Sequence, residues 1–95
     1  MVSQINDRVK STAVSVGTAA TALPAIILTG RASLVLHNDG SNTVYLGGSA
    51  VTTSGATKGL PLASGAEFQL DIGKAGIIYG IVATGTESVI CFEGA

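Results

Sequence analysis

The sequence predicts an all-β protein: a compact antiparallel β-sandwich, jelly roll or small barrel of about six to eight short strands. Short apolar runs recur about every ten residues, with glycine or proline between them. Several of these runs alternate apolar and polar residues, as half-buried strands do. No helical period extends over the ten or so residues that a helix needs, so the crossover helices of a parallel sheet are not expected.

The first predicted strand occupies residues 11–16, where small polar and apolar side chains alternate before Gly17. Residues 18–23 extend this strand or pair again before Pro24. Because proline cannot donate a ladder hydrogen bond, this second segment is predicted to lie at an edge or a corner.

The strongest local signal is a β-hairpin within residues 31–48, with strands at 32–37 and 43–46. The polar cluster Asn38-Asp39-Gly40 lies between the two apolar runs and is typical of a tight turn. Asp39 is explained by this turn, since its side chain can accept backbone N–H groups there.

The second half of the chain begins with a predicted surface loop, 49–59, which is rich in Ser, Thr, Ala and Gly. The apolar run 60–62 follows, and residues 67–72 then alternate so that Phe68, Leu70 and Ile72 face the core.

Residues 77–83 are apolar on both faces, which indicates a central strand or one covered by another subunit. The last strand, 87–93, places Ile90 and Phe92 on one face and Val89 and Cys91 on the other.

Ninety-five residues make one domain, predicted as an extended amino-terminal arm over 1–10 and a single β domain over 11–95. A domain of this size buries only about two thirds of its chain surface. Its 13 glycines raise the entropy lost on folding, and only 12% of its residues are charged. A thin core with much uncharged surface favours self-association.

The charges exclude several classes of partner. The net charge is −1 and no run of the sequence supplies a basic cluster, so neither nucleic acid nor an anionic membrane is expected as a partner. The apolar stretch 19–28 is too short to cross a bilayer and contains Pro24. Cys91 is the only cysteine, which excludes an intrachain disulfide and agrees with synthesis in a reducing cytoplasm.

The chain offers little for catalysis, and we expect no enzyme activity, catalytic residue, cofactor or metal. His37 and Cys91 are single residues of their types, while zinc needs three or four ligands. Asp39 and Asp71 lack the spacing of a calcium loop. A jelly-roll enzyme is therefore the alternative with the least support. A small glycan-binding module stays open because Ser and Thr are abundant, although aromatic residues are few.

Several short motifs, in their order along the chain, resemble a family of small tailed-phage virion proteins. The resemblance covers about residues 14–92. Its motifs are Gly17-Thr18, Ala22-Leu23-Pro24, Gly30-Arg31, Leu34-Val35-Leu36, Asn38-Asp39-Gly40, Val44-Tyr45-Leu46-Gly47-Gly48, and Leu60-Pro61-Leu62 with Gly65, Phe68 and Leu70. The resemblance implies an all-β fold and a role on the particle, as a capsid decoration (cement) protein or a head-fibre base. It also implies a homotrimer, and it carries no catalytic residue. The polar arm 1–10 is not matched by the pattern.

The expected function is that of a structural virion protein that stabilises the phage head by binding the major capsid protein or another virion protein. The protein would be made in the host bacterial cytoplasm and incorporated into the virion. A tail, adaptor or head-fibre component is the alternative within the same particle. The residues expected to make contacts lie in the arm and in the loop 49–59: Gln4, Ile5, Arg8, Val9, Ser49, Val51, Thr53 and Lys58.

Overall fold

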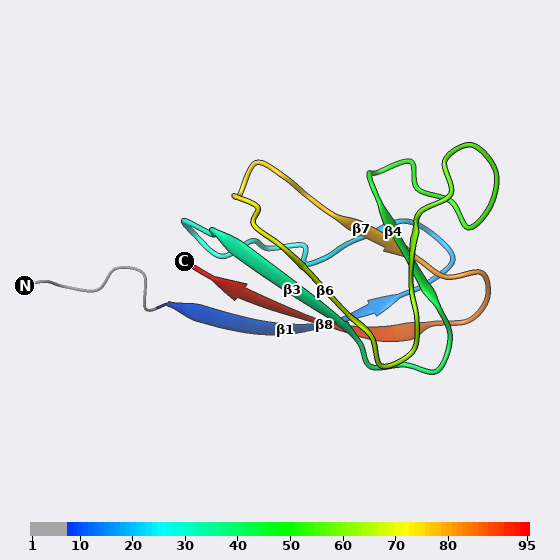
Figure 1. Cartoon of the computed structure of the whole chain (residues 1–95), viewed down its shortest axis with the longest axis horizontal. Helices are drawn as coiled ribbons and strands as arrows, with labels where there is room; N and C mark the ends of the chain where they lie inside the picture. Colours follow the sequence, from blue (N-terminus) through cyan, green and yellow to red (C-terminus); the bar gives the residue numbers. More distant parts are fainter. Residues whose placement is uncertain (1–7) are drawn as a thin grey trace, which may run out of the picture.

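The computed structural model describes residues 8–95, which form eight strands (Figure 1). Among these residues there is no helix long and apolar enough to cross a membrane. The strands are β1 (Val9–Val16), β2 (Thr21–Ala22), β3 (Ser33–Asn38), β4 (Val44–Gly47), β5 (Leu60–Leu62), β6 (Glu67–Leu70), β7 (Tyr79–Ile81) and β8 (Glu87–Gly94).

The strands build two four-stranded antiparallel sheets, which we call the β1 sheet (order β1-β8-β3-β6) and the β2 sheet (order β2-β7-β4-β5). Pairing is nested along the chain, because β1 pairs with β8, β2 with β7, β3 with β6 and β4 with β5. The two halves of the chain therefore run antiparallel to each other, and successive strand pairs lie alternately in the β1 sheet and the β2 sheet. This is the arrangement of a jelly roll. The predicted β-sandwich is confirmed.

The core lies between the sheets and follows from alternation along the strands. In β3 and β8 every second residue is buried, so one face of the β1 sheet is inside and the other outside. Both sheets contribute mainly aliphatic side chains of moderate size: Val16, Leu23, Leu34, Leu36, Val44, Leu46, Leu62, Val82, Val89 and Cys91.

The predicted hairpin is wrong, because β3 and β4 belong to different sheets. Each strand instead takes two neighbours, so that β3 lies between β8 and β6, and β4 lies between β7 and β5. Their apolar side chains then meet across the core, which a two-stranded hairpin alone could not provide. The polar residues 38–43 form a crossing between sheets rather than a hairpin turn.

Side chains from distant segments shape this crossing. The Asn38 amide group donates to the carbonyl oxygens of Asn42 (2.8 Å) and Leu62 (2.9 Å). The buried Glu87 carboxylate accepts the backbone N–H groups of Ser41 (3.0 Å) and Asn42 (3.2 Å). A Cβ atom at Gly40 would lie 1.8 Å from Glu87 Oε1, so a side chain here would displace the carboxylate from this position.

The side chain that accepts a backbone N–H group in this turn is that of Asn38 and not, as was predicted, that of Asp39. The Asn38 side-chain oxygen accepts the backbone N–H of Gly40 (3.0 Å), while Asp39 is exposed. The asparagine is completely buried, so its amide must find partners inside the protein.

The structure also bears on the predictions for the central strand, the edge strand, the arm and Leu70. The strand predicted to be central, β7, does lie between β2 and β4, and β2 is an edge strand as Pro24 requires. Strand β1 begins at Val9, inside the predicted arm. Leu70, predicted to face the core, is 38% exposed because β6 is an edge strand.

Replacing Glu87 tests the account of the crossing. Glu87→Ala leaves the amides of Ser41 and Asn42 without their acceptor, and we expect a loss of about 3 kcal/mol in the free energy of unfolding. Urea denaturation measures this loss. Glu67→Ala is the control, since the Glu67 side chain is 67% exposed, and it should change stability by less than about 0.5 kcal/mol. Equal effects of the two substitutions would contradict the account.

Candidate interaction surface

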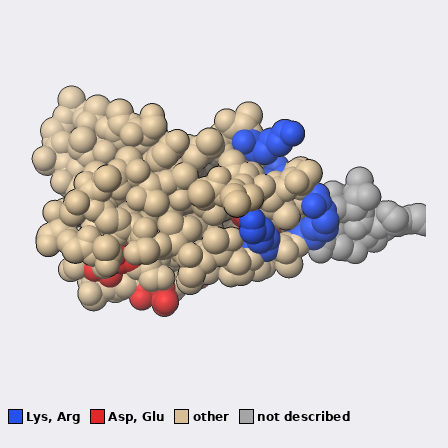
Figure 2. Space-filling model, turned by 180° about the vertical axis from the view of Figure 1, so that it is seen from behind, with Lys and Arg blue, Asp and Glu red and all other residues tan. Residues whose placement is uncertain are grey.

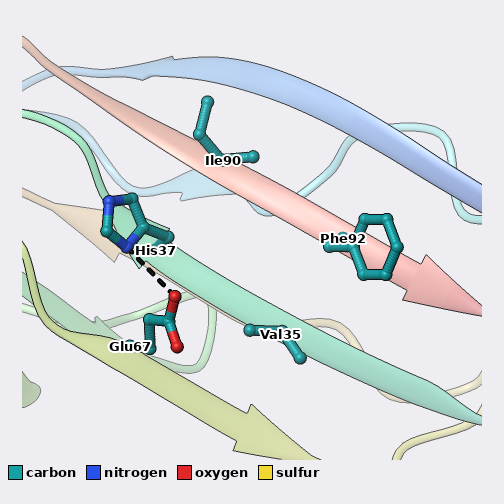
Figure 3. A pocket seen from close by; sticks show the side chains of 5 residues that line it. All are labelled: Val35, His37, Glu67, Ile90 and Phe92. Atoms are coloured by element: carbon teal, nitrogen blue, oxygen red, sulfur yellow. Dashed lines mark ion pairs between the residues drawn. The ribbon is translucent and has the colours of Figure 1, made fainter.

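The outer face of the β1 sheet carries an apolar surface that the core does not use. Strand β8 contributes Ile90 and Phe92, and β3 contributes Val35 and His37. The strand register places Val35 beside Phe92 and His37 beside Ile90, with Glu67 of β6 next to His37. These side chains line a shallow hollow of about 340 Å³ (Figure 3). Phe92 is 46% exposed, which is a large apolar group to leave in water.

Ionisable groups border one end of this hollow. His37 Nδ1 lies 3.5 Å from Glu67 Oε2, and His37 Nε2 lies 4.0 Å from Asp39 Oδ1. The imidazole is thus flanked by two exposed carboxylates, so the surface combines an apolar floor with an acidic rim.

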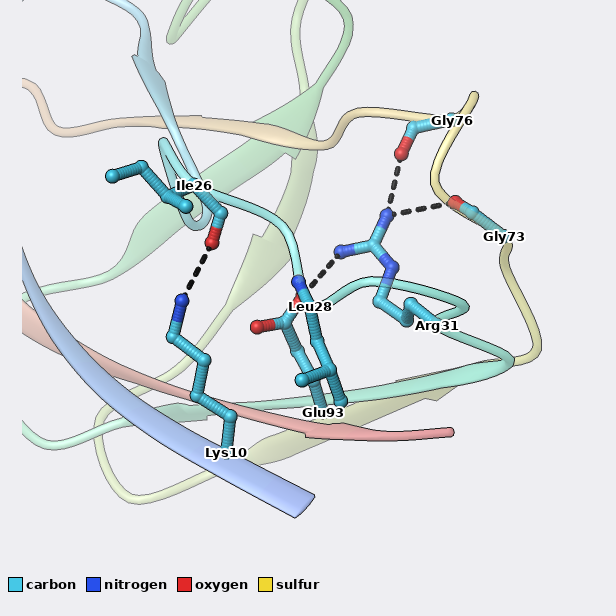
Figure 4. A network of polar contacts seen from close by, with 7 residues as sticks. All are labelled: Lys10, Ile26, Leu28, Arg31, Gly73, Gly76 and Glu93. Atoms are coloured by element: carbon cyan, nitrogen blue, oxygen red, sulfur yellow. Dashed lines mark hydrogen bonds and ion pairs between the residues drawn. The ribbon is translucent and has the colours of Figure 1, made fainter. Parts of the chain in front are cut away.

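A buried ion pair fixes the end of β8 next to Phe92 (Figure 4). Arg31 Nη1 lies 3.2 Å from Glu93 Oε2, and both side chains are fully buried. The same carboxylate oxygen accepts the backbone N–H of Leu28 at 3.1 Å. Arg31 Nη2 donates to the carbonyl oxygens of Gly73 (3.0 Å) and Gly76 (2.5 Å). Two loops are therefore tied to the strand that presents Phe92.

Cys91 lies on the inner face of β8, two residues before Glu93, and is fully buried as a small core residue. Burial raises the pKa of its thiol from 9.0 to about 12; the nearby Glu93 carboxylate adds to the rise and Arg31 opposes it. The thiol therefore stays protonated, and unreactive, at neutral pH.

The residues predicted for the arm are described only in part. Gln4 and Ile5 lie outside the described residues. Arg8 is exposed and donates to the carbonyl oxygen of Thr29. Val9 is 62% exposed at the start of β1.

The residues predicted for the loop do not act as one group. Ser49 and Lys58 are exposed, Thr53 is partly exposed, and Lys58 Nζ lies 5.8 Å from the centre of the Tyr45 ring. Val51 is 6% exposed and packs close to Gly47 and Gly59, so within the single chain little of its side chain is open to a contact. The loop and the start of β1 lie at opposite ends of the molecule and do not form one site (Figure 1).

The outer face of the β1 sheet was not among the surfaces predicted from the sequence. A signal was present, because residues 87–93 are apolar on both faces while a strand with one wet face should alternate. The pairing with β3, which brings Val35 beside Phe92, could not be read from local pattern alone.

A second apolar area lies where the edge strands β5 and β6 leave the sandwich open. Leu60 is 54% exposed, Leu70 38% and Ile77 45%, around a hollow of about 300 Å³. Much of the remaining surface is uncharged. On the face shown in Figure 2, basic side chains gather near the start of β1 and acidic ones lie toward the other end.

The Arg31–Glu93 pair predicts a coupled loss of stability. Arg31→Met leaves the Glu93 carboxylate buried without its cation, and we expect it to lower the free energy of unfolding by about 3 to 5 kcal/mol. The double variant Arg31→Met/Glu93→Leu should lose less than Arg31→Met alone, because no uncompensated charge remains. Urea denaturation of both variants measures this. A double variant less stable than the single one would refute the coupling.

The state of Cys91 predicts slow thiol labelling. At pH 8 the folded protein should react with a disulfide reagent at least about a hundredfold more slowly than the urea-unfolded chain, because the thiol is buried and its raised pKa leaves little thiolate. Absorbance of the released thiolate follows the reaction. Labelling at the same rate with and without urea would show that the strand is open.

Among residues 8–95 no three His, Cys, Asp or Glu side chains lie close enough together to hold a metal ion.

The comparisons with known proteins do not add to this geometry. Comparison of the chain with protein-family models, with curated proteins and with solved structures found no match.

Proposed function

We propose that this chain is a structural protein of a virus particle, which associates with itself and binds the outside of the phage head as a decoration (cement) protein. The exposed apolar outer face of the β1 sheet, to which Phe92 contributes the largest side chain, is the observation that carries the assembly role. The resemblance of the ordered motifs to small tailed-phage virion proteins supports the viral assignment. The homotrimer and the major capsid protein as partner belong to the same proposal and come from that resemblance.

Assembly is favoured because burying water-exposed apolar side chains against a partner lowers the free energy. Val35, Ile90 and Phe92 form a continuous apolar strip on a strand-paired, rigid face. Burying such a strip against a partner gains roughly 25 cal/mol for each Å² removed from water. One contact of this size is modest. Repetition by symmetry on a particle adds avidity, so a small module can hold capsid subunits together.

A tail, adaptor or head-fibre component would use the same surface and differs only in location. Density at a tail vertex, rather than at the symmetry axes of the head, would favour that alternative.

A small glycan-binding module is the second candidate, and one observation favours it. The Phe92 ring is exposed in the same hollow that Glu67 and His37 line at its other end, and an aromatic face with hydrogen-bonding groups nearby suits a sugar ring. Saturable binding of the isolated protein on a glycan array, lost in Phe92→Ala, would support this candidate over the first.

The test of the proposed function uses phage particles that lack the protein. Purified wild-type chain is added, and imaging by electron microscopy should show new density at the symmetry axes of the head. Ile90→Ser/Phe92→Ser should abolish this density because it removes the apolar strip. Leu60→Ser is the control, since Leu60 is exposed on the other apolar area, and it should still bind. Absence of wild-type density from the particle, or equal binding by all three chains, would contradict the proposal.

A further inference from the structure

Strand β1 is a sheet edge without the protection that the other three edges carry. Native edges are shielded from pairing by shortness, proline, bulges or charge. Strand β2 has two residues and precedes Pro24, β5 has three residues including Pro61, and β6 has four and begins with Glu67. Strand β1 has eight residues and no proline.

The features of β1 itself leave it open to pairing. Its register with β8 runs without interruption from Val9 to Val16, so no bulge distorts it. Its one charged side chain, Lys10, donates to the carbonyl oxygen of Ile26 at 3.0 Å (Figure 4). This charge is therefore not available to shield the edge from pairing with another strand. The outward-facing side chains Ser11, Ala13 and Ser15 are small and exposed.

The hydrogen-bond pattern identifies the free backbone groups. The carbonyl oxygen of Arg8 accepts the N–H of Ala95 at 2.9 Å, so Arg8 faces β8. Because backbone groups of successive residues point to opposite sides of a strand, Lys10, Thr12 and Val14 also face β8. The N–H and C=O groups of the intervening residues point away from the sheet: Val9, Ser11, Ala13 and Ser15.

We propose that a second copy of this chain pairs with β1 through its own β1, antiparallel and related by a two-fold axis. An occupant must supply a strand of similar length without proline. Among the described strands only β8 is as long, and β8 is paired on both sides. Within residues 8–95 no strand pairs with the outer edge of β1, so the identical edge of a second copy offers the same groups, and an antiparallel contact of a strand with itself is self-complementary.

A register centred on Thr12 uses the largest number of the free groups. With Thr12 on the axis, Val9 pairs with Ser15 of the partner subunit and Ser11 with Ala13 of the partner subunit, so all the outward groups are used. A register centred on Ala13 would need the carbonyl of Gly17, which already accepts the N–H of Val82 at 3.0 Å. The first register leaves no group in competition.

The Thr12 side chain supplies a second reason for this register. Its hydroxyl is buried and has no hydrogen-bond partner among the described residues. On the axis it faces Thr12 of the partner subunit, with Cβ atoms about 4.5 to 5.5 Å apart, a distance at which two threonine hydroxyls hydrogen-bond. Lys10 would lie opposite Val14 of the partner subunit, so no like charges meet.

The pairing joins the two β1 sheets into one continuous sheet whose apolar outer faces share one surface. It does not rest on the proposed function. A two-fold contact can join two chains or two cyclic trimers. In either case the oligomer in solution contains an even number of chains.

Two charge variants at the same positions test this proposal. In the proposed register residue 11 faces residue 13 of the partner subunit, so Ser11→Lys/Ala13→Lys places like charges opposite one another. Ser11→Glu/Ala13→Lys places opposite charges there and is the matched control. Light scattering coupled to size exclusion should give an even number of chains for wild type, half that mass for the double lysine variant and the wild-type mass for the control.

Three results would overturn the pairing. They are a wild-type monomer at every concentration, an odd number of chains, and equal masses for the two variants. Circular dichroism confirms that each variant keeps the β fold, and the control variant shows that positions 11 and 13 tolerate charged side chains.

Discussion

Strand β8 holds the two ends of this sandwich together through a pair of buried carboxylates. Its inner face places Val89 and Cys91 between Glu87 and Glu93. Glu87 accepts backbone N–H groups of the crossing from β3 to β4, while Glu93 holds Arg31 and the amide of Leu28. A buried carboxylate without such partners would cost several kcal/mol, so each loop must take the position that supplies them. Both ends of the jelly roll are thereby fixed from one strand.

The same strand determines what the outside of the molecule can do. Because inner positions of β8 are committed to the core and the carboxylates, Ile90 and Phe92 must face outward beside Val35. A core made mainly of Val and Leu, against which Phe68 packs only partly buried, is thin, and large apolar side chains are left exposed on the domain. The exposed strip and the unshielded edge of β1 lie on one sheet. A partner strand that pairs with β1 extends this sheet and leaves the strip exposed on its outer face, where a different partner can bind.

The fold class could be predicted from the sequence because alternation and glycine spacing are local properties of the chain. Partner choice is not local, and the hairpin shows this. The cluster Asn38-Asp39-Gly40 signals a turn, but Glu87, which directs the turn across the sandwich, lies 46 residues from Ser41. The candidate surface was missed for the same reason, since Val35 meets Phe92 only through strand pairing. The arm and the loop 49–59 were predicted to make contacts because of their composition. In the structure Val51 of the loop is buried, and the start of β1 and the loop lie at opposite ends of the molecule.

Amide hydrogen exchange along β1, followed by NMR at low and high protein concentration, tests most directly whether the β1 sheet is the surface of assembly. Lys10, Thr12 and Val14 bond to β8 and should exchange slowly at all concentrations. We expect the amides of Val9, Ser11, Ala13 and Ser15 to exchange fast in dilute protein and to become protected as copies associate. Rapid exchange of these four amides at concentrations where the protein is associated would contradict it.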